Sequence, residues 1–250
     1  MAGLPSAAKL NHDLGRDTLE PNMDSIFPFP VAPAIPVVGS IAVFPVRRIY
    51  CVGRNYADHA REMGMDPNRE PPFFFGKPHD VVVPGGGDIT YPPATSNLHY
   101  EVELVVALAK GGRGISANEA LGHVYGYAVG IDLTRRDLQA KSKDKGQPWD
   151  TAKGFDQSAP ISAITPVSTG GHRESGAIWL SVNGLEKQRG DLSQMTWSVP
   201  EVIAHISGFV ALAPGDLIFT GTPAGVGPIV RGDKIRCGID GLGELEIVMI

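Results

Sequence analysis

Two glutamates stand one residue apart at the start of an apolar run. Glu101 and Glu103 lead into Leu104–Leu108, a stretch of Val, Leu and Ala that predicts a strand entering a core. Because successive side chains of a strand point to opposite faces, both carboxylates, and His99 with them, would lie on one face. Two such carboxylates repel each other, and partial burial would protonate at least one of them. The alternative is a solvated strand face, which is the commoner outcome for this short motif alone.

A divalent cation would relieve both the repulsion and the burial of these carboxylates. Ligation by oxygen alone favours Mg²⁺ or Mn²⁺, with Ca²⁺ as an alternative, over zinc. Asp132 can supply a third carboxylate, because it follows a second apolar strand, Gly122–Ile131. It also precedes an expected helix over Leu133–Ala140, so it can equally be the N-cap of that helix. The sequence leaves these two interpretations of Asp132 open.

Three further residues have both a structural and a chemical interpretation. His59 and Glu62 lie three apart in Gly53–Gly64, which predicts a short helix, so they share one helix face. They are either an ordinary surface pair, which is the commoner case, or an acid–base pair. Lys153 stands between small and apolar residues. It is either a surface lysine, again the commoner case, or a partly desolvated donor beside a reacting oxygen.

Two other segments are more often structural than functional. The aromatic run Phe73–Phe75 is typical of a core rather than of a binding site. The glycine-rich loop Gly221–Gly227 could present backbone N–H groups to an anion. A tight turn is the commoner outcome for such a loop.

Composition excludes several classes of partner. The chain has 250 residues and a formal net charge of −5, which argues against nucleic acid and gives no attraction to an anionic membrane. An anionic substrate would therefore need local positive charge. Cys51 and Cys237 are far apart in apolar surroundings and are expected to be buried and reduced, as in a cytoplasmic protein. No apolar run approaches the length of a membrane span.

The chain is predicted to contain one main domain. Residues 1–25 are expected to form a disordered leader, residues 26–44 a Pro-rich extended segment, and residues 45–250 the domain itself. The 31 glycines and 21 prolines indicate many turns and short strands. Asn183-Gly184 predicts a hairpin over Ile178–Gln188, and Val199–Phe209 predicts a short amphipathic helix.

Six short motifs occur in the order seen in one enzyme family. They are Gly53-Arg54-Asn55-Tyr56 with His59 and Glu62, Phe75-Gly76-Lys77-Pro78, His99-Tyr100-Glu101-Val102-Glu103-Leu104, Gly130-Ile131-Asp132, Ala152-Lys153-Gly154-Phe155-Asp156, and Thr220-Gly221-Thr222-Pro223-Ala224-Gly225-Val226-Gly227. Over about residues 45–250 the chain resembles the fumarylacetoacetate hydrolase family, and within it the bacterial acylpyruvate hydrolases that act on fumarylpyruvate or maleylpyruvate in gentisate breakdown. Each motif is weak alone, but six in order are specific.

The resemblance implies a fold, a cofactor and an assembly. The fold is α+β but mostly β, a mixed β-sandwich roll of the fumarylacetoacetate hydrolase C-terminal-domain type with short flanking helices. Residues 45–250 would form the metal-dependent hydrolase domain, usually a homodimer. One Mg²⁺ or Mn²⁺ would be held by Glu101, Glu103 and Asp132.

The resemblance also implies roles for the remaining site residues. His59 would orient Glu62, which would take a proton from water as general base, and Lys153 would stabilise oxyanion charge. The reaction would be hydrolysis of a C–C bond in an acylpyruvate, a small anionic 2-oxo acid, with pyruvate leaving as its enolate. The residues expected to bind substrate are Arg54, Tyr56, Arg136, Gln139 and Thr222.

Two rival functions use the same carboxylates. A decarboxylase or isomerase acting on oxaloacetate or a related 2-oxo diacid needs the metal and the enolate, but not a water-activating pair. A non-catalytic β-rich module could use the three carboxylates for a structural Ca²⁺. That second rival leaves His59, Glu62 and Lys153 without a role.

Replacing the expected base separates hydrolysis from decarboxylation. Glu62→Gln should lower kcat for acylpyruvate cleavage by ~10²–10⁴-fold, the usual worth of a positioned general base. KM should change little, because the lost interaction acts on the transition state. Any oxaloacetate decarboxylation should survive better, whereas Glu101→Ala should abolish both reactions. If Glu62→Gln cleaves acylpyruvates at the parent rate, the acid–base role is wrong and His59 and Glu62 are an ordinary surface pair.

Overall fold

The computed structural model describes residues 26–28, 31–58 and 70–250. The chain divides into two units, Met1–Val31 and Ala32–Ile250, and the second contains every strand and helix considered below. His59 and Glu62 lie outside the described residues. Among the residues that are described, no helix is long and apolar enough to cross a bilayer.

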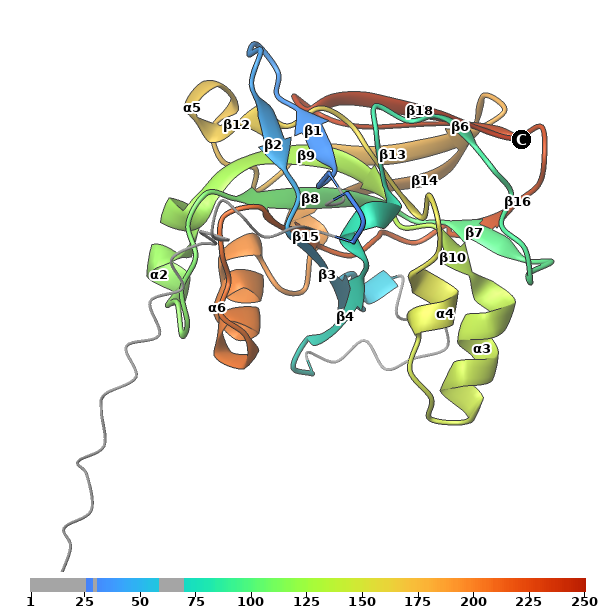
Figure 1. Ribbon diagram of the computed structural model, residues 1–250, viewed down its shortest axis with the longest axis horizontal. Coiled ribbons are helices and arrows are strands. Elements are labelled where there is room, and N and C mark those ends of the chain that lie inside the picture. The colour runs from blue at the N-terminus through green and yellow to red at the C-terminus, as the bar shows by residue number, and fades with distance from the viewer. Residues whose placement is uncertain (1–25, 29–30, 59–69) are drawn as a thin grey trace, which may run out of the picture. The chain divides into compact units, whose positions relative to one another are not determined.

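A mixed sheet forms the centre of the second unit (Figure 1). Its strand order is β4-β3-β15-β8-β9-β11-β5, and β12 pairs with β9 outside this path. The pairs β15–β3 and β11–β5 are parallel and the others are antiparallel. The strands are β3 (Arg48–Gly53), β4 (Phe73–Lys77), β5 (Val82–Pro84), β8 (Val102–Leu108), β9 (Val124–Ile131), β11 (Ala159–Ile161), β12 (Thr165–Pro166) and β15 (Asp216–Phe219).

The remaining strands form three smaller sheets. The five-stranded sheet has the order β14-β13-β17-β18-β6, the three-stranded sheet β10-β7-β16, and β1 pairs with β2. Their strands are β1 (Ala34–Pro36), β2 (Val43–Pro45), β6 (Gly87–Ile89), β7 (Leu98–Tyr100), β10 (Thr134–Arg135), β13 (Ala177–Val182), β14 (Leu185–Asp191), β16 (Gly227–Ile229), β17 (Lys234–Ile239) and β18 (Gly243–Met249).

The helices are short. They are α2 (Ala117–Ala120), α3 (Arg136–Asp144), α4 (Asp150–Lys153), α5 (Val167–Gly170) and α6 (Val199–Phe209), with 3₁₀ turns η1 (His79–Val81), η2 (Leu121–His123) and η3 (Leu192–Gln194). Figure 1 shows α3 and α4 side by side next to β10, and α6 apart from them. The chain is thus mostly β with short flanking helices, as the resemblance implied.

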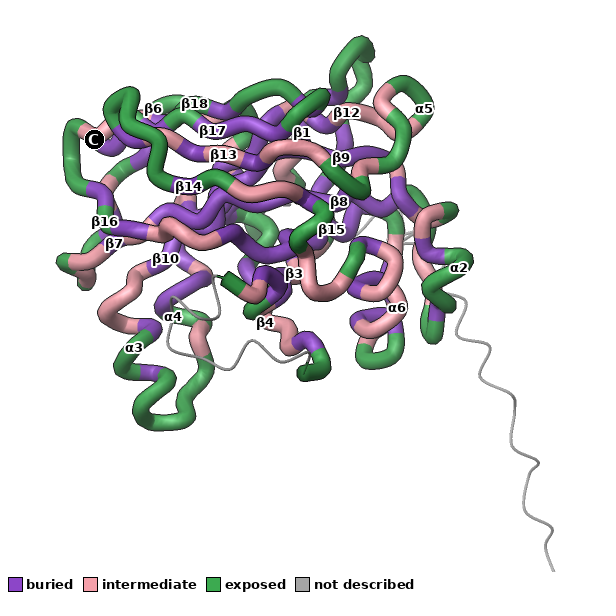
Figure 2. The backbone as a smooth tube through the Cα atoms, turned by 180° about the vertical axis from the view of Figure 1, so that it is seen from behind, coloured by how far each residue is buried: buried purple, intermediate pink, exposed green. Residues whose placement is uncertain are grey.

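Strand β8 is buried along its whole length because both of its faces are covered (Figure 2). Leu104 and Val106 belong to a core shared with the five-stranded sheet, whereas Val105 and Ala107 pack into a second core that includes residues of β1 and β2. A strand covered on both faces reads as a continuous apolar run rather than an alternating one. This explains the run that follows Glu103.

Most of the predicted local elements are confirmed. The hairpin β13–β14 turns at Asn183 and Gly184, whose positive φ angles of 52° and 79° suit a type I′ turn. Helix α6 has the predicted bounds and begins with a capping box between Ser198 and Glu201. Both cysteines are free and buried.

The prediction for the segment after Asp132 is wrong in one respect. The helix begins at Arg136 rather than at Leu133, and Arg135 is its N-cap. The two residues before it form β10, which pairs with β7. This tertiary pairing overrides the local helical pattern, and Asp132 is not a helix cap.

A substitution at Gly130 tests how tightly β9 packs against β8 and β15. A Cβ at this position would lie 2.6 Å from Phe219 Cε1 and 2.6 Å from Val105 Cγ2. We expect Gly130→Ala to lower the free energy of unfolding by about 1–3 kcal/mol, the usual cost of an overpacked core. Urea unfolding measures this. Gly122→Ala, with no atom within 4 Å of its new methyl group, should stay within about 0.5 kcal/mol of the parent.

A candidate metal and substrate site

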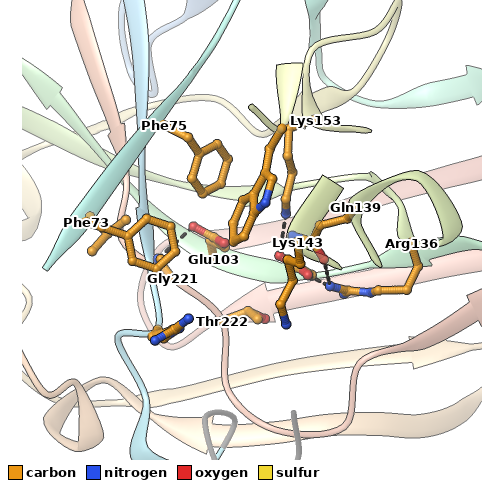
Figure 3. A pocket seen from close by; sticks show the side chains of 14 residues that line it. Phe73, Phe75, Glu103, Arg136, Gln139, Lys143, Lys153, Gly221 and Thr222 are labelled. Carbon is orange, nitrogen blue, oxygen red and sulfur yellow. Dashed lines mark hydrogen bonds and ion pairs between the residues drawn. The ribbon is translucent and has the colours of Figure 1, made fainter. Parts of the chain in front are cut away.

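A cavity opens where β4, the start of β8 and helices α3 and α4 meet (Figure 3). It holds about 440 Å³ of atom-free space, counted to its open mouth. Its lining combines acidic, basic and aromatic side chains: Val52, Gly53, Arg54, Phe73, Phe75, Glu101, Glu103, Arg136, Gln139, Lys143, Trp149, Lys153, Gly221 and Thr222.

Three buried carboxylates meet at the inner end of this cavity. Glu101 occupies the one-residue break between β7 and β8, Glu103 lies on β8, and Asp132 follows β9. The register of β8 against β9 places Glu103 opposite Gly130, and the Asp132 N–H donates to the Glu101 carbonyl at 2.8 Å. One oxygen from each carboxylate lies within 4.8 Å of the other two. Non-local strand pairing therefore brings the three carboxylates together.

Lys153 is buried among these carboxylates. Its Nζ donates to Glu101 Oε2 at 2.9 Å, to Asp132 Oδ2 at 2.7 Å and to Thr134 Oγ1 at 2.7 Å. Its side chain is 2% exposed, so the commoner prediction of a surface lysine is wrong. The sequence could not show this, because the burial arises from the packing of α4 against β4 and β10.

Lys77 supplies a second buried positive charge. Its Nζ lies 2.9 Å from Asp132 Oδ1 and donates to the carbonyls of Leu133, Lys153 and Ser158. An ammonium has only three protons, and these carbonyls accept all three. The contact with Asp132 is therefore an ion pair without a hydrogen bond, and Asp132 Oδ1 has no hydrogen-bond partner among the described residues.

Arg136 completes the set of paired cations. It lies at the first position of α3 and donates to Glu101 Oε1 and, at 2.5 Å, to Gln139 Oε1. Its Nε also donates to His99 Nδ1 at 3.4 Å. His99 thus contacts Arg136, which is paired with Glu101.

Glu103 differs from the other two carboxylates. Among the described residues, its side chain accepts one hydrogen bond, from the Gly221 N–H to Oε2 at 2.7 Å. Burial, reinforced by the charges of Asp132 and Glu101, raises the pKa of Glu103 well above its usual range, although Lys153 opposes this. Burial alone would lower the pKa of Lys153, but the Asp132 and Glu101 carboxylates outweigh it and raise that pKa.

The three carboxylates fit a hard divalent cation. Oxygens on opposite sides of one Mg²⁺ or Mn²⁺ lie about 4.2 Å apart, so a mutual spread of up to 4.8 Å needs little tightening. Asp132 Oδ1 is a buried oxygen that lacks a hydrogen-bond donor in the described part of the chain. The donor set is oxygen alone, which favours Mg²⁺ or Mn²⁺ over zinc.

Aromatic side chains form the outer wall of the cavity (Figure 3). Phe73 meets Trp149 edge to face at a ring-centroid distance of 5.2 Å, and Phe75 lies 5.6 Å from the same indole. Phe73 and Phe75 are only half-buried. Phe75 also packs against the second core, so the prediction of a core role for this aromatic run is correct in part, and Phe73 and Phe75 also line the cavity.

The structure places most predicted site residues around the one cavity. Those that line it are Arg54, Glu101, Glu103, Arg136, Gln139, Lys153 and Thr222, with Asp132 adjoining them. Tyr56 is not among the lining residues. It is 2% exposed, its hydroxyl has no partner among the described residues, and burial raises its pKa. The Gly221 N–H faces Glu103, a carboxylate of this chain.

Sequence analysis missed Lys77 and Lys143. Lys77 stood inside a recognised motif, but its burial depends on carbonyls from three distant segments. Lys143 could have been found, because Arg136, Gln139 and Lys143 are spaced three and four apart and so share one helix face.

The fold and the cavity define a mostly β protein with a buried, oxygen-rich site suited to a hard cation. Residues 48–249 match the family model described as fumarylacetoacetate (FAA) hydrolase C-terminal, and the chain belongs to this family. A fumarylpyruvate hydrolase of a Ralstonia species is 45% identical over 185 residues, which cover 74% of this chain and 96% of that protein. A mitochondrial oxaloacetate tautomerase of Mus musculus is 45% identical over 200 residues, covering 80% and 90%.

A solved structure extends the similarity to three dimensions. The crystal structure of fumarylpyruvate hydrolase from Pseudomonas aeruginosa in complex with Mn²⁺ and pyruvate has a TM-score of 0.89 to this chain. The two are 51% identical, and the match covers 91% of this chain and 99% of that one. The relatives found are enzymes of the same family.

The raised pKa of Glu103 predicts a pH-dependent loss of stability in the metal-free protein. A raised acid pKa means that the folded state holds the proton more tightly, so stability falls as pH rises from 4.5 toward the folded pKa. Glu103→Gln removes this penalty. In EDTA the variant should melt above the parent at pH 8, by about 2–4 °C per kcal/mol, and the difference should shrink toward pH 5.

Two comparisons make this measurement decisive. Glu174→Gln changes an exposed glutamate away from the cavity and should leave the melting temperature unchanged. Added Mn²⁺ should stabilise the parent more than Glu103→Gln, which lacks one ligand. A metal-free variant that melts below the parent at pH 8 would contradict the prediction.

Proposed function

We propose that this protein is a Mg²⁺- or Mn²⁺-dependent hydrolase that cleaves a C–C bond of an acylpyruvate to give pyruvate and a carboxylic acid. The observation that carries this proposal is the buried triad of Glu101, Glu103 and Asp132 beside Arg136 and Lys153. The similarity to a fumarylpyruvate hydrolase solved with Mn²⁺ and pyruvate supports the same chemistry.

In this proposal the three carboxylates hold the metal. A bound ion would supply Lewis acidity, which polarises the 2-oxo group and stabilises the negative charge of a developing enolate. Arg136, oriented by Gln139, binds the carboxylate at the pyruvyl end of the substrate, because a guanidinium fits a carboxylate in a fork. Lys153 keeps its hydrogen bonds to Glu101, Asp132 and Thr134, and its buried positive charge stabilises developing oxyanion charge electrostatically.

Water activation is assigned from the sequence. Glu62, oriented by His59, takes the proton of the attacking water, and both residues lie outside the described part of the chain. The proposal also includes a two-fold homodimer, the commonest symmetric assembly, and a place in gentisate-type aromatic catabolism.

Oxaloacetate is the second candidate substrate. The similarity to an oxaloacetate tautomerase is as high as that to the Ralstonia hydrolase. A tautomerase moves a proton between the keto and enol forms and breaks no C–C bond. It nevertheless needs the same binding contacts to a 2-oxo acid. The three carboxylates, Arg136 and Lys153 could serve either reaction.

A direct assay distinguishes these functions. Protein stripped with EDTA and reloaded with Mg²⁺ or Mn²⁺ should cleave fumarylpyruvate, with loss of enol absorbance and release of one pyruvate per substrate. The metal-free protein should be inactive. The kcat of Glu103→Ala for fumarylpyruvate should be at least 10²-fold lower than that of the parent even with metal present, by analogy with the loss of an electrostatic stabiliser. Rapid enol–keto interconversion of oxaloacetate without pyruvate release from any acylpyruvate would favour the tautomerase instead.

A further inference from the structure

Two cations face the cavity without being committed to its carboxylates. The Nζ of Lys143, on α3, makes no hydrogen bond or ion pair with the described residues, and Figure 3 shows this side chain among those that line the cavity. Within the described residues, Arg54 has one ion pair, a 3.9 Å contact with Glu70, in which the side chains are 38% and 70% exposed. Exposed pairs of this kind contribute little, so Glu70 can be exchanged for a ligand carboxylate.

Charge counting shows that these two cations are in excess. The carboxylates Glu101, Glu103 and Asp132 carry three negative charges, and Lys77, Lys153 and Arg136 carry three positive charges. With all six groups ionised, the inner cluster is therefore neutral before any divalent ion binds. Arg54 and Lys143 add two positive charges to the lining, and a divalent metal would add two more.

The two cations repel each other. Burial, followed by the charges of Arg54 and Arg136, lowers the pKa of Lys143. Arg54 also has a positive φ of 62°, a conformation that is strained for a residue with a side chain. Its guanidinium lies 5.3 Å from the centroid of the Phe73 ring, at the aromatic wall. An anion bound between Arg54 and Lys143 would relieve the repulsion.

The aromatic side chains of the cavity wall favour a flat, apolar segment between the two charged ends of a ligand. Phe73, Phe75, Trp149 and Arg54 line both the acidic cavity and an adjoining, more open hollow. A flat, conjugated chain can pack against these rings while its ends reach charged groups. The cavity thus offers cations at two places, Arg136 and Lys153 at the inner end and Arg54 and Lys143 toward the solvent.

We propose that Lys143 and Arg54 bind a second carboxylate, at the acyl end of the substrate, so that the enzyme selects dicarboxylate acylpyruvates over monocarboxylate ones. This inference rests on the proposed function, because it assumes that the pyruvyl end binds at Arg136. It assigns substrate selection to Lys143, a residue outside the family motifs of this sequence.

The test compares two substrates that share the pyruvyl end. Fumarylpyruvate carries the second carboxylate, and crotonylpyruvate carries a methyl group in its place. In Mg²⁺-loaded protein, Lys143→Gln should lower the ratio of kcat/KM for fumarylpyruvate to that for crotonylpyruvate by about 10- to 100-fold, the usual range for a charged hydrogen bond. Lys143→Arg should restore most of the ratio. The loss should appear mainly in KM.

Lys141→Gln is the matched control. Lys141 lies on the same helix, is exposed and does not line the cavity, so the ratio should stay at the parent value. Equal losses on both substrates in Lys143→Gln would place Lys143 at the pyruvyl end and overturn the inference. An unchanged ratio in both Lys143→Gln and Arg54→Gln would also overturn it.

Binding of the acyl product gives a readout that does not depend on turnover. By calorimetry, Mg²⁺-loaded parent protein should bind fumarate at least 10-fold more tightly than crotonate, and Lys143→Gln should remove most of that difference. If neither acylpyruvate releases pyruvate, the proposed function fails, and this binding preference still tests the second carboxylate site. Equal affinity of the parent for fumarate and crotonate would refute the inference while leaving hydrolysis untouched.

Discussion

Three carboxylates buried within a few ångströms of one another repel strongly, and the structure around the cavity is arranged to compensate that repulsion. Carboxylates in a medium of low dielectric either take up protons or attract positive charge. Glu101 and Asp132 are compensated by Lys153, with Arg136 and Lys77 on their outer sides. In the described part of the chain, Glu103 accepts a hydrogen bond from one backbone N–H and feels the charge of Lys153, and its raised pKa indicates that this compensation is incomplete. A divalent cation supplies what is missing, so metal binding and the stability of this region are linked.

Lys77 connects this electrostatic requirement to the fold. Its ammonium donates hydrogen bonds to the carbonyls of Leu133, between β9 and β10, of Lys153, at the end of α4, and of Ser158, before β11. These carbonyls belong to segments that hold Asp132 and Lys153 in place. A buried charge with satisfied hydrogen bonds orients its surroundings, whereas removal of one partner leaves a costly unpaired group. Lys77 is therefore a positioning residue that acts through Asp132 and Lys153.

Local rules predicted the part of the site that depends on strands. Alternation along β8 indicated that Glu101 and Glu103 point the same way, and the end of an apolar run indicated Asp132. The hairpin at Asn183 and the helix at Val199 followed from turn and capping chemistry. Lys153 could not be predicted to be buried, because nothing within α4 encodes its contacts with β4 and β10. The start of α3 was predicted three residues too early for the same reason, since the pairing of β10 with β7 is a long-range interaction.

The chain carries a net charge of −5, yet the mouth of the cavity is cationic. These two facts agree, because charges farther apart than about 8 Å are largely screened at physiological ionic strength. A bound anion therefore responds to Arg54, Arg136 and Lys143 rather than to distant carboxylates. The same screening limits long-range steering, so selectivity must arise from contacts made inside the cavity. With all of its groups ionised, the inner cluster is neutral before metal binds. Each added positive charge in the cavity therefore attracts a multiply charged substrate more strongly than a singly charged one.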